Sequence, residues 1–459
     1  MRPRIGLLLL YLELYDQVLP ELRDRLSCFS KKIADGFKKK GIFVITSEIC
    51  RLKEEFGSAI RNFEAEDVDA IVTLHLAYSP SLECAHILAK TDKPLIVLDT
   101  TPDSSFNIEA GPDDIMANHG IHGVQDLCNM LIRLNKDFFI EAGHWKDDEA
   151  LDRAAARIRG ALAAKNFKNS KIGSIGGYFK GMGDFSIDSE SLSKTFGLQT
   201  IYFDPKQIKD IDSSIDASII EKESEELKKK YKSKLNNEES LPNSVKSGLI
   251  IRKWVKDNNL NGFSFNFSKT DRKMGFKTLP FMEAGLSMAR GIGYAGEGDV
   301  LTACLVGALS RVFSKTTFTE MFCPDWKGGS IFLSHMGEAN PDLLAEPLMV
   351  EKEIPFIDTE DPVLIAGRFK PGPAILANLA PLGGDKYRFL VCEGKMLEVD
   401  NRKLKDTIRG WFKPNKRVPD FLEDYSQYGG THHLAMVYGD LSREMSTLGR
   451  IMGWEVINI

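Results

Sequence analysis

Residues 70–98, AIVTLHLAYSPSLECAHILAKTDKPLIVL, decide the fold class of this chain. Ala70–Leu74 is an apolar run typical of a buried strand, Leu82–Ala89 has helical periodicity, and Pro94–Leu98 is a second buried strand. A strand, a helix and a strand in this order predict a parallel pair joined by a crossover helix. The stretch therefore indicates an α/β fold, in which ligands lie beyond the carboxyl ends of the strands.

The alternation of strands and helices covers the first two of three expected domains, and a change of pattern after residue 316 marks the third. We predict an N-terminal α/β domain over residues 1–168, a central α/β domain over residues 169–316 and a β-rich C-terminal domain over residues 317–459. Beyond residue 316, proline and glycine become frequent between short extended runs. This pattern of short extended runs separated by proline and glycine is typical of an antiparallel barrel or sandwich.

Two local patterns give further expectations. The segment Glu221–Lys234, EKESEELKKKYKSK, is charged almost throughout and predicts a solvated helix with Glu–Lys pairs four residues apart. The run Met396–Val399 predicts a separate short strand of the β-rich region.

Composition limits the classes of function. The chain has 459 residues, of which 43% are hydrophobic and 27% charged, as in an ordinary soluble protein. Its net charge of -5 argues against nucleic acid as a partner, and no apolar run approaches the ~20 residues of a membrane helix. The seven cysteines include no CxxC, so we expect reduced thiols in the cytoplasm and no structural zinc site.

Glutamates and histidines in glycine-rich or strand-like contexts are the candidates for chemistry. Glu297 lies in GYAGEGDV, Glu320 in TFTEMF, His335 in FLSHMGEAN, and the pair His432 and His433 in YGGTHHLAMVYGD. Two glutamates with two histidines form a mixed set of oxygen and nitrogen donors suited to Mn²⁺, Co²⁺, Fe²⁺ or Zn²⁺. A histidine packed in the core, an incidental pair and a glutamate at a helix N-terminus are the structural alternatives.

The motifs GYAGEGDVLTA, FTEMF, LSHMGEANP and GGTHHLAMV resemble, in order and approximate spacing, the metal-site motifs of bacterial L-arabinose isomerases. The resemblance covers most of the chain, because FSFNFSKTDRKMGFKTLP, VTLHLAYSP, KPLIVLDT, NHGIHGVQD and AGHW also match family landmarks. It implies an α/β fold with two Rossmann-like doubly wound domains followed by a β-rich, antiparallel barrel-like C-terminal domain. It also implies a cytoplasmic aldose–ketose isomerase that needs a divalent metal, usually Mn²⁺, with Co²⁺ or another ion as the alternative.

Carried over by motif, Glu297, Glu320, His335 and His433 are the implied metal ligands, and His432 is the alternative to His433. The resemblance further implies that the two glutamates move protons during catalysis. If His433 is the ligand, His432 is left to contact the substrate.

The resemblance also implies an assembly. The family builds its active site at the interface of a homo-oligomer, a trimer or a hexamer, where one histidine enters the neighbouring pocket. His122 fits the pattern of that histidine, and His119 is the rival assignment. The expected ligand is a small sugar, with neither nucleic acid nor membrane as a partner.

The segments expected to contact the sugar depart from the family. GLLLLYLELYDQ replaces a GSQHLYG-like segment that carries a glutamine, and GGYFKGMGD replaces a GDN-x-R segment. The phenylalanine that shapes the pocket falls to Phe267 or Phe265, while Phe179 stands between Tyr178 and Lys180 in the altered segment. We therefore expect His122, His432, Phe179 and Phe267 to contact a sugar other than L-arabinose.

Two other functions stay open at this point. An L-fucose/D-arabinose-type isomerase or a sugar epimerase would keep the chemistry and change the substrate, although fucose-type enzymes use Glu, Asp and His as ligands. A non-catalytic sugar-binding protein is also built from two α/β domains, but it would not need metal-type residues. No GxGxxG follows the first strand, so we expect neither nicotinamide nor flavin.

Overall fold

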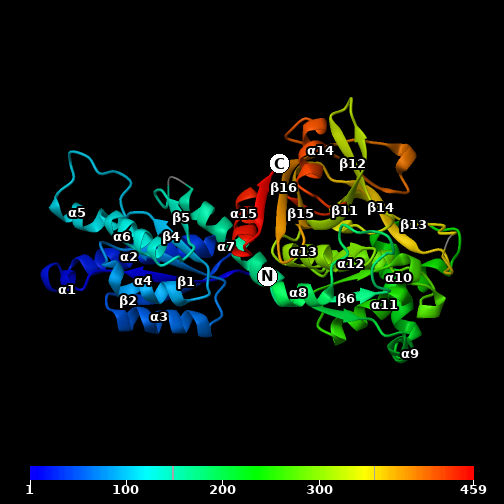
Figure 1. Cartoon of the computed structure of the whole chain (residues 1–459), viewed down its shortest axis with the longest axis horizontal. Coiled ribbons are helices and arrows are strands. Elements are labelled where there is room, and N and C mark those ends of the chain that lie inside the picture. The colour runs from blue at the N-terminus through cyan, green and yellow to red at the C-terminus, as the bar shows by residue number, and fades with distance from the viewer. Residues whose placement is uncertain (147–148, 356) are drawn as a thin grey trace. The chain divides into compact units, whose positions relative to one another are not determined.

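The computed structural model describes residues 1–146, 149–355 and 357–459, and the chain divides into two compact units, Met1–Lys165 and Asn166–Ile459 (Figure 1). The second unit contains two sheets. The predicted domain boundaries after residues 168 and 316 stay predictions. Among the described residues, no helix combines the length and the apolar character that spanning a bilayer requires.

The first unit is a parallel sheet with helices packed on it. Its elements are β1 (Arg4–Leu10), α1 (Leu14–Val18), α2 (Leu22–Lys39), β2 (Phe43–Cys50), α3 (Lys53–Ala65), β3 (Ala70–His75), α4 (Ser81–Lys90), β4 (Leu95–Asp99), α5 (Pro112–Asn118), α6 (Gly120–Arg133), β5 (Phe139–Ala142) and most of α7 (Ala150–Phe167). The strand order is β2-β1-β3-β4-β5, and each pair is parallel. The strand–helix–strand pattern predicted for residues 70–98 is confirmed as β3, α4 and β4.

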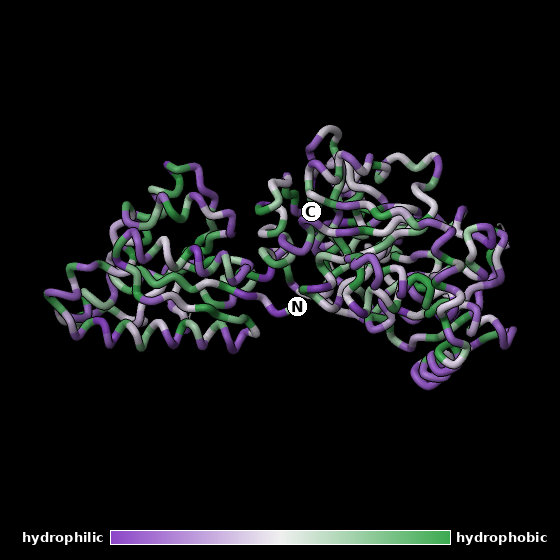
Figure 2. Tube along the Cα trace, turned by 90° about the horizontal axis from the view of Figure 1, so that it is seen from below, coloured by the Kyte–Doolittle hydropathy of each residue, from purple (hydrophilic) through white to green (hydrophobic). Residues whose placement is uncertain are grey.

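Amphipathic helices build the core of the first unit. On one face of the sheet, Phe63 of α3, Leu88 of α4 and Leu127 of α6 pack in one buried cluster with Leu8 and Leu10 of β1. Figure 2 shows hydrophilic and hydrophobic segments alternating along the turns of these outer helices. One apolar stripe per helix is therefore sufficient to cover the sheet.

His75 ends β3 in an unusual environment, because it is buried and neither ring nitrogen has a hydrogen-bond partner among the residues that the structure describes. Helix α6 packs directly on the imidazole. A Cβ atom at Gly123 would lie 2.4 Å from Cδ2 of His75, so this close approach requires glycine. Burial lowers the pKa of His75 to about 3 although Asp126 acts in the opposite direction. The side chain is therefore neutral in the folded protein at neutral pH.

The second unit combines a small parallel sheet with a large, mainly antiparallel one. Its elements are β6 (Lys171–Ile175), α8 (Ser189–Phe196), β7 (Gln199–Tyr202), α9 (Pro205–Ser213), α10 (Ala217–Lys230), β8 (Lys232–Lys234), α11 (Ser240–Asp257), β9 (Gly262–Phe265), η1 (Phe267–Lys269), η2 (Arg272–Met274), α12 (Phe281–Ala289), β10 (Gly293–Gly296), α13 (Val300–Ser310), β11 (Thr316–Asp325), β12 (Ser330–Ser334), η3 (Pro341–Leu343), β13 (Leu344–Glu351), β14 (Val363–Phe369), β15 (Gly372–Pro381), β16 (Tyr387–Met396), η4 (Arg402–Leu404), β17 (Ile408–Pro414), α14 (Val418–Gln427), β18 (His433–Tyr438), α15 (Ser442–Ile451) and β19 (Glu455–Asn458). The parallel sheet has the order β10-β9-β6-β7.

The larger sheet closes on itself. Antiparallel pairs connect β16, β15, β18, β11, β12 and β17 in this order, and β17 pairs back with β16. Closure leaves these strands without a free edge, which removes a template for aggregation. The predicted antiparallel, barrel-like C-terminal sheet is therefore confirmed.

Two local predictions are wrong. The charged helix α10 ends at Lys230, because Tyr231 adopts an extended conformation and is buried in the core, after which Lys232–Lys234 pairs with β13 as strand β8. Met396–Val399 is not a separate strand. Met396 is the last residue of β16, which continues this far because it pairs with β15 along the whole length of both strands.

The neutral burial of His75 predicts a pH-dependent stability of the first unit. In the unfolded chain this histidine takes up a proton below a pKa of about 6.5, whereas the folded state resists protonation down to about pH 3. His75 therefore does not lower the stability above pH 6.5, whereas at pH 5 its exclusion of a proton should lower the free energy of unfolding by about 2 kcal/mol. The variant His75→Leu should lose this part of the pH dependence. Hydrogen exchange of peptides from residues 1–165 at pH 7 and pH 5 measures it.

The matched control is His86→Leu, which removes an exposed histidine from α4 of the same unit. Its stability should depend on pH between pH 7 and pH 5 in the same way as that of the wild type. A wild-type profile that is flat between pH 7 and pH 5 would contradict the neutral burial of His75.

Candidate functional site

The register of three antiparallel strands brings three of the candidate side chains together. Glu320 of β11 lies opposite His433, the first residue of β18, and opposite Ser334, the last residue of β12. His335 follows Ser334 directly. Oε1 of Glu320 is 3.1 Å from Nε2 of His335 and 3.0 Å from Nε2 of His433. The carboxylate of Glu320 therefore lies between two imidazoles.

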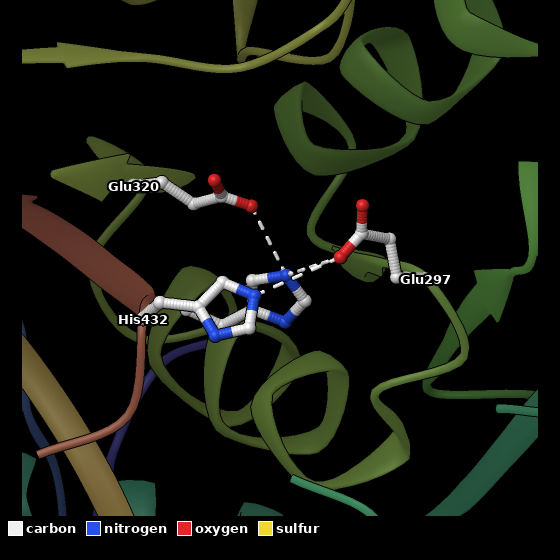
Figure 3. A group of neighbouring side chains, drawn as sticks. Glu297, Glu320 and His432 are labelled. Carbon is white, nitrogen blue, oxygen red and sulfur yellow. Dashed lines mark ion pairs between the residues drawn. The ribbon is translucent and has the colours of Figure 1, made fainter. Parts of the chain in front are cut away.

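Glu297 approaches the same place from the turn between β10 and α13. Its φ angle is +63°, which is unusual for a residue with a side chain and costs on the order of 1–3 kcal/mol. Its carbonyl accepts a hydrogen bond from the N–H of Phe179. Oε2 of Glu297 is 3.4 Å from Nε2 of His433 and 3.7 Å from Nε2 of His432. Figure 3 shows Glu297, Glu320 and His432 directed toward one another.

The members of this cluster differ in depth. The side chains of His433 and His335 are 0% and 2% exposed, whereas His432 is 39% exposed and lies at the rim. Single ligand atoms of Glu297, Glu320, His432 and His433 lie within 4.8 Å of one another. His335 is not in this group of four, but its contact of 3.1 Å with Glu320 joins it to the same site. The ligand role of each residue stays a prediction.

A carboxylate supports each buried histidine from behind. Nδ1 of His335 is 2.6 Å from Oε2 of Glu338, and Nδ1 of His433 is 2.9 Å from Oδ2 of Asp299. The hydroxyl of Tyr294 donates to the other oxygen of Glu338. A carboxylate at Nδ1 fixes the ring orientation and directs Nε2 toward a ligand, as behind many metal-binding histidines.

The pKa values of the cluster move in opposite directions. Burial raises the pKa of Glu297, but the imidazoles of the histidine pair outweigh burial and hold it at about 2. Burial lowers the pKa of His335, but the carboxylates of Glu338 and Glu320 outweigh burial and raise it to about 10. In the same way, the neighbouring imidazoles lower the pKa of Glu320, and the neighbouring carboxylates raise the pKa of His433. Protons on the imidazoles therefore balance the buried carboxylates.

The donor set fits a divalent cation. Oε2 of Glu297 and Nε2 of His433 are buried and make no hydrogen bond within the described part of the chain. They meet only in ion pairs, with each other at 3.4 Å and with neighbouring groups of the cluster, and a cation bound between them could replace these contacts. Carboxylate oxygens together with imidazole nitrogens suit Mn²⁺, Co²⁺ or Zn²⁺. Which ion the site prefers stays a prediction, as does Mn²⁺ itself.

One aromatic ring packs on the site and two others pack on each other. The rings of Phe179 and Phe267 are 5.3 Å apart, and Phe185 stacks on His433 at 4.6 Å with an interplanar angle of 11°. Phe265, the alternative to Phe267, is buried in the core against Tyr294. Contact of Phe179 or Phe267 with a substrate stays a prediction.

The histidines assigned to a neighbouring pocket lie in the first unit. His122 is exposed in the first turn of α6. His119 precedes this helix, and its Nε2 is 3.1 Å from the hydroxyl of Tyr15. The two imidazoles are 5.4 Å apart and meet edge to face. A role for either histidine in the site stays a prediction.

Sequence reasoning missed the carboxylates that support the histidines, namely Asp184, Asp299 and Glu338. Two of them carried a signal, because Asp299 and Glu338 lie inside the motifs of Glu297 and His335, within three residues of them. Asp184 ends the segment GGYFKGMGD, but its partner could not be read from the sequence, because 248 positions separate it from His432.

Comparison with known proteins gives a consistent set of relatives. Family models described as the L-arabinose isomerase central domain and C-terminal domain match residues 191–315 and 315–455. L-Arabinose isomerase 1 of Clostridium acetobutylicum is 25% identical over 452 residues, which cover 94% of this chain and 91% of that one. L-Arabinose isomerase of Shouchella clausii is 24% identical and covers 96% of this chain and 92% of its own.

Among solved structures, a periplasmic solute-binding protein of an ABC transporter from Actinobacillus succinogenes, with bound D-allose, covers 68% of this chain and 92% of its own. It is 12% identical, with a TM-score of 0.18.

The carboxylate behind His335 gives a prediction about metal binding. Glu338→Gln keeps the size of the side chain but removes the charge that accepts from Nδ1 of His335. We expect affinity for Mn²⁺ to fall between about tenfold and a hundredfold, as when such partners are removed from other metal sites. Equilibrium dialysis against Mn²⁺ measures this, and Glu455→Gln, at an exposed position of β19, is the control. Unchanged affinity in a folded Glu338→Gln protein would show that Glu338 does not orient a ligand.

Proposed function

Because the chain belongs to the L-arabinose isomerase family, we propose that it is a metal-dependent aldose–ketose isomerase whose preferred sugar differs from L-arabinose. Family membership makes the chain an aldose–ketose isomerase, and its identity of about 25% with named relatives makes it a divergent member. The convergence of Glu297, Glu320, His335 and His433 in one buried cluster carries the proposal of metal dependence.

The cluster is suited to moving protons within a sugar. Isomerisation transfers a hydrogen between C1 and C2 and a proton between O1 and O2 of the substrate. A divalent ion at this site would supply the positive charge that polarises the carbonyl group. The low pKa of Glu297 and Glu320 keeps both carboxylates ionised at neutral pH. Either carboxylate can therefore accept a proton from the substrate, and the protonated carboxyl group that results can return this proton to the neighbouring atom of the sugar.

Sugar specificity should come from outside this cluster. The cluster meets O1 and O2, which all aldoses share, so discrimination depends on the groups that face the distal hydroxyls. Phe179 and Phe267 are apolar there, and the hydroxyl of Tyr178 is already used by the carbonyl of Ile187. A buried sugar hydroxyl without a partner costs about 1–3 kcal/mol. We propose a substrate with fewer or differently placed distal hydroxyls than L-arabinose.

A screen of free pentoses and hexoses tests the function. With Mn²⁺ or Co²⁺ the protein should form a ketose from at least one aldose, without added metal it should not, and L-arabinose should not give the highest kcat/KM. Glu297→Gln and Glu320→Gln should abolish turnover, because glutamine cannot accept a proton.

The outcomes separate the alternatives. Metal-independent binding without turnover would identify a sugar-binding protein. An epimer in place of a ketose would identify an epimerase. L-Arabinose as the best substrate would refute the altered specificity. Full activity in either glutamine variant would remove that glutamate from catalysis.

We also propose a homo-oligomer, a trimer or a hexamer, in which His122 completes the site of a neighbour. The surface near His122 supports this. Helices α1 and α5 and the loop before α5 lie at one end of the first unit (Figure 1). Together with the start of α6, they expose large apolar side chains. These are Leu14, Val18, Phe106, Ile108, Ile115 and Ile121. Exposed apolar patches of this kind often mark protein interfaces.

We also propose that the protein works in the cytoplasm. All seven cysteines are free thiols, which supports a reducing compartment.

Subunit mixing tests the shared site. His122→Ala and Glu297→Gln should each be inactive alone. Mixed oligomers should regain up to about a quarter of wild-type activity, because a quarter of randomly paired sites combine both intact residues. The same mixture with His119→Ala decides between the two histidines. A mixture that stays inactive although hybrid oligomers form would place the whole site within one chain.

A further inference from the structure

The loop between β6 and α8, residues 176–188, reaches the histidine pair through Asp184. One oxygen of this residue, Oδ2, accepts a hydrogen bond from the backbone N–H of His432 at 3.0 Å and lies 2.7 Å from Nδ1 of the same residue. A single carboxylate oxygen therefore fixes both the main chain and the ring of His432. The next residue, Phe185, stacks on His433.

The loop itself is held against the site. The N–H of Phe179 donates to the carbonyl of Glu297, and the side-chain amide of Asn266 donates to the carbonyl of Tyr178. These hydrogen bonds join the loop to two neighbouring turns of the parallel sheet. The start of the loop that carries Asp184 is therefore tied to the turn that carries Glu297.

His432 differs from the two buried histidines. Nε2 of His335 and Nε2 of His433 both lie within 3.1 Å of Glu320. Nε2 of His432 is 3.7 Å from Glu297, and the ring is 39% exposed. A ring at the open rim, with Nδ1 anchored and Nε2 facing the carboxylates, is placed to meet a molecule that enters from solvent.

We infer that Asp184 is a positioning residue that holds Nε2 of His432 toward the sugar and outside the coordination of the divalent ion. This inference rests on the proposed function, because it names a residue that orients a substrate contact of the same site. It leaves the ion to Glu297, Glu320, His335 and His433. An imidazole that is misplaced by a small distance loses its hydrogen bond to a sugar oxygen, so the anchor decides substrate binding.

Steady-state kinetics and metal binding together test the inference. Asp184→Ala should lower kcat/KM for the best sugar between about tenfold and a hundredfold, mainly through KM. Affinity for Mn²⁺ and the visible absorption spectrum of the Co²⁺ protein should stay as in the wild type. Asp184→Asn keeps an oxygen that accepts both hydrogen bonds, so it should rescue most of the loss.

A double-mutant cycle shows whether Asp184 acts through His432. Asp184→Ala should have no further effect in a His432→Ala protein, because the ring that it positions is gone. The control Asp188→Ala removes another exposed acid of the same loop, the cap of α8, and should leave KM unchanged. Additive effects of Asp184→Ala and His432→Ala would overturn the inference.

The Co²⁺ spectra need no turnover and separate the two hypotheses. A changed spectrum in His432→Ala would make His432 a metal ligand and would overturn the inference even if sugars are converted. A wild type that converts no sugar would refute the proposed function. In that case an unchanged spectrum in Asp184→Ala and His432→Ala still places His432 outside the ion's coordination, and loss of sugar binding in calorimetry for both variants supports the anchor.

Discussion

The site depends on the register in which β11 pairs with β18 on one side and β12 on the other. Successive side chains of a strand point to opposite faces of the sheet. A slip of one residue would therefore turn Glu320 away from His433 and from the turn that holds His335. The pairing of Glu320 with His433 and Ser334 is thus a structural and a chemical constraint at once. Glu297 adds a second constraint, because it reaches the same point only with a positive φ angle.

The electrostatics of the cluster link the site to the rest of the second unit. Asp299 accepts from the N–H of Thr302 with one oxygen and lies 2.9 Å from Nδ1 of His433 with the other. The start of α13 and the orientation of a barrel histidine are therefore coupled through one side chain. Because the neighbouring carboxylates raise the pKa of His335 and His433, both imidazoles carry protons at neutral pH, and a metal ion bound there would have to displace these protons.

The sequence predicts the fold class well and the supports of the site poorly. Periodicity identifies β3, α4 and β4 because each buries an apolar face, and the motifs point to Glu297, Glu320, His335 and the histidine pair. The end of α10 was missed because burial of Tyr231, a tertiary contact, stops a segment with strong helical pattern. The partner of His432 could not be predicted, since only folding brings Asp184 next to it.

Closure of the barrel has a consequence for how the protein is made. Strand β11 is synthesised long before β18, yet Glu320 meets His433 only after β18 has paired with β11. Such pairings between distant segments form late, after their loop-closure entropy has been overcome. A nascent chain that carries Glu297, Glu320 and His335 therefore still lacks the deepest imidazole. The cluster is therefore complete only after β18 has been synthesised and paired with β11.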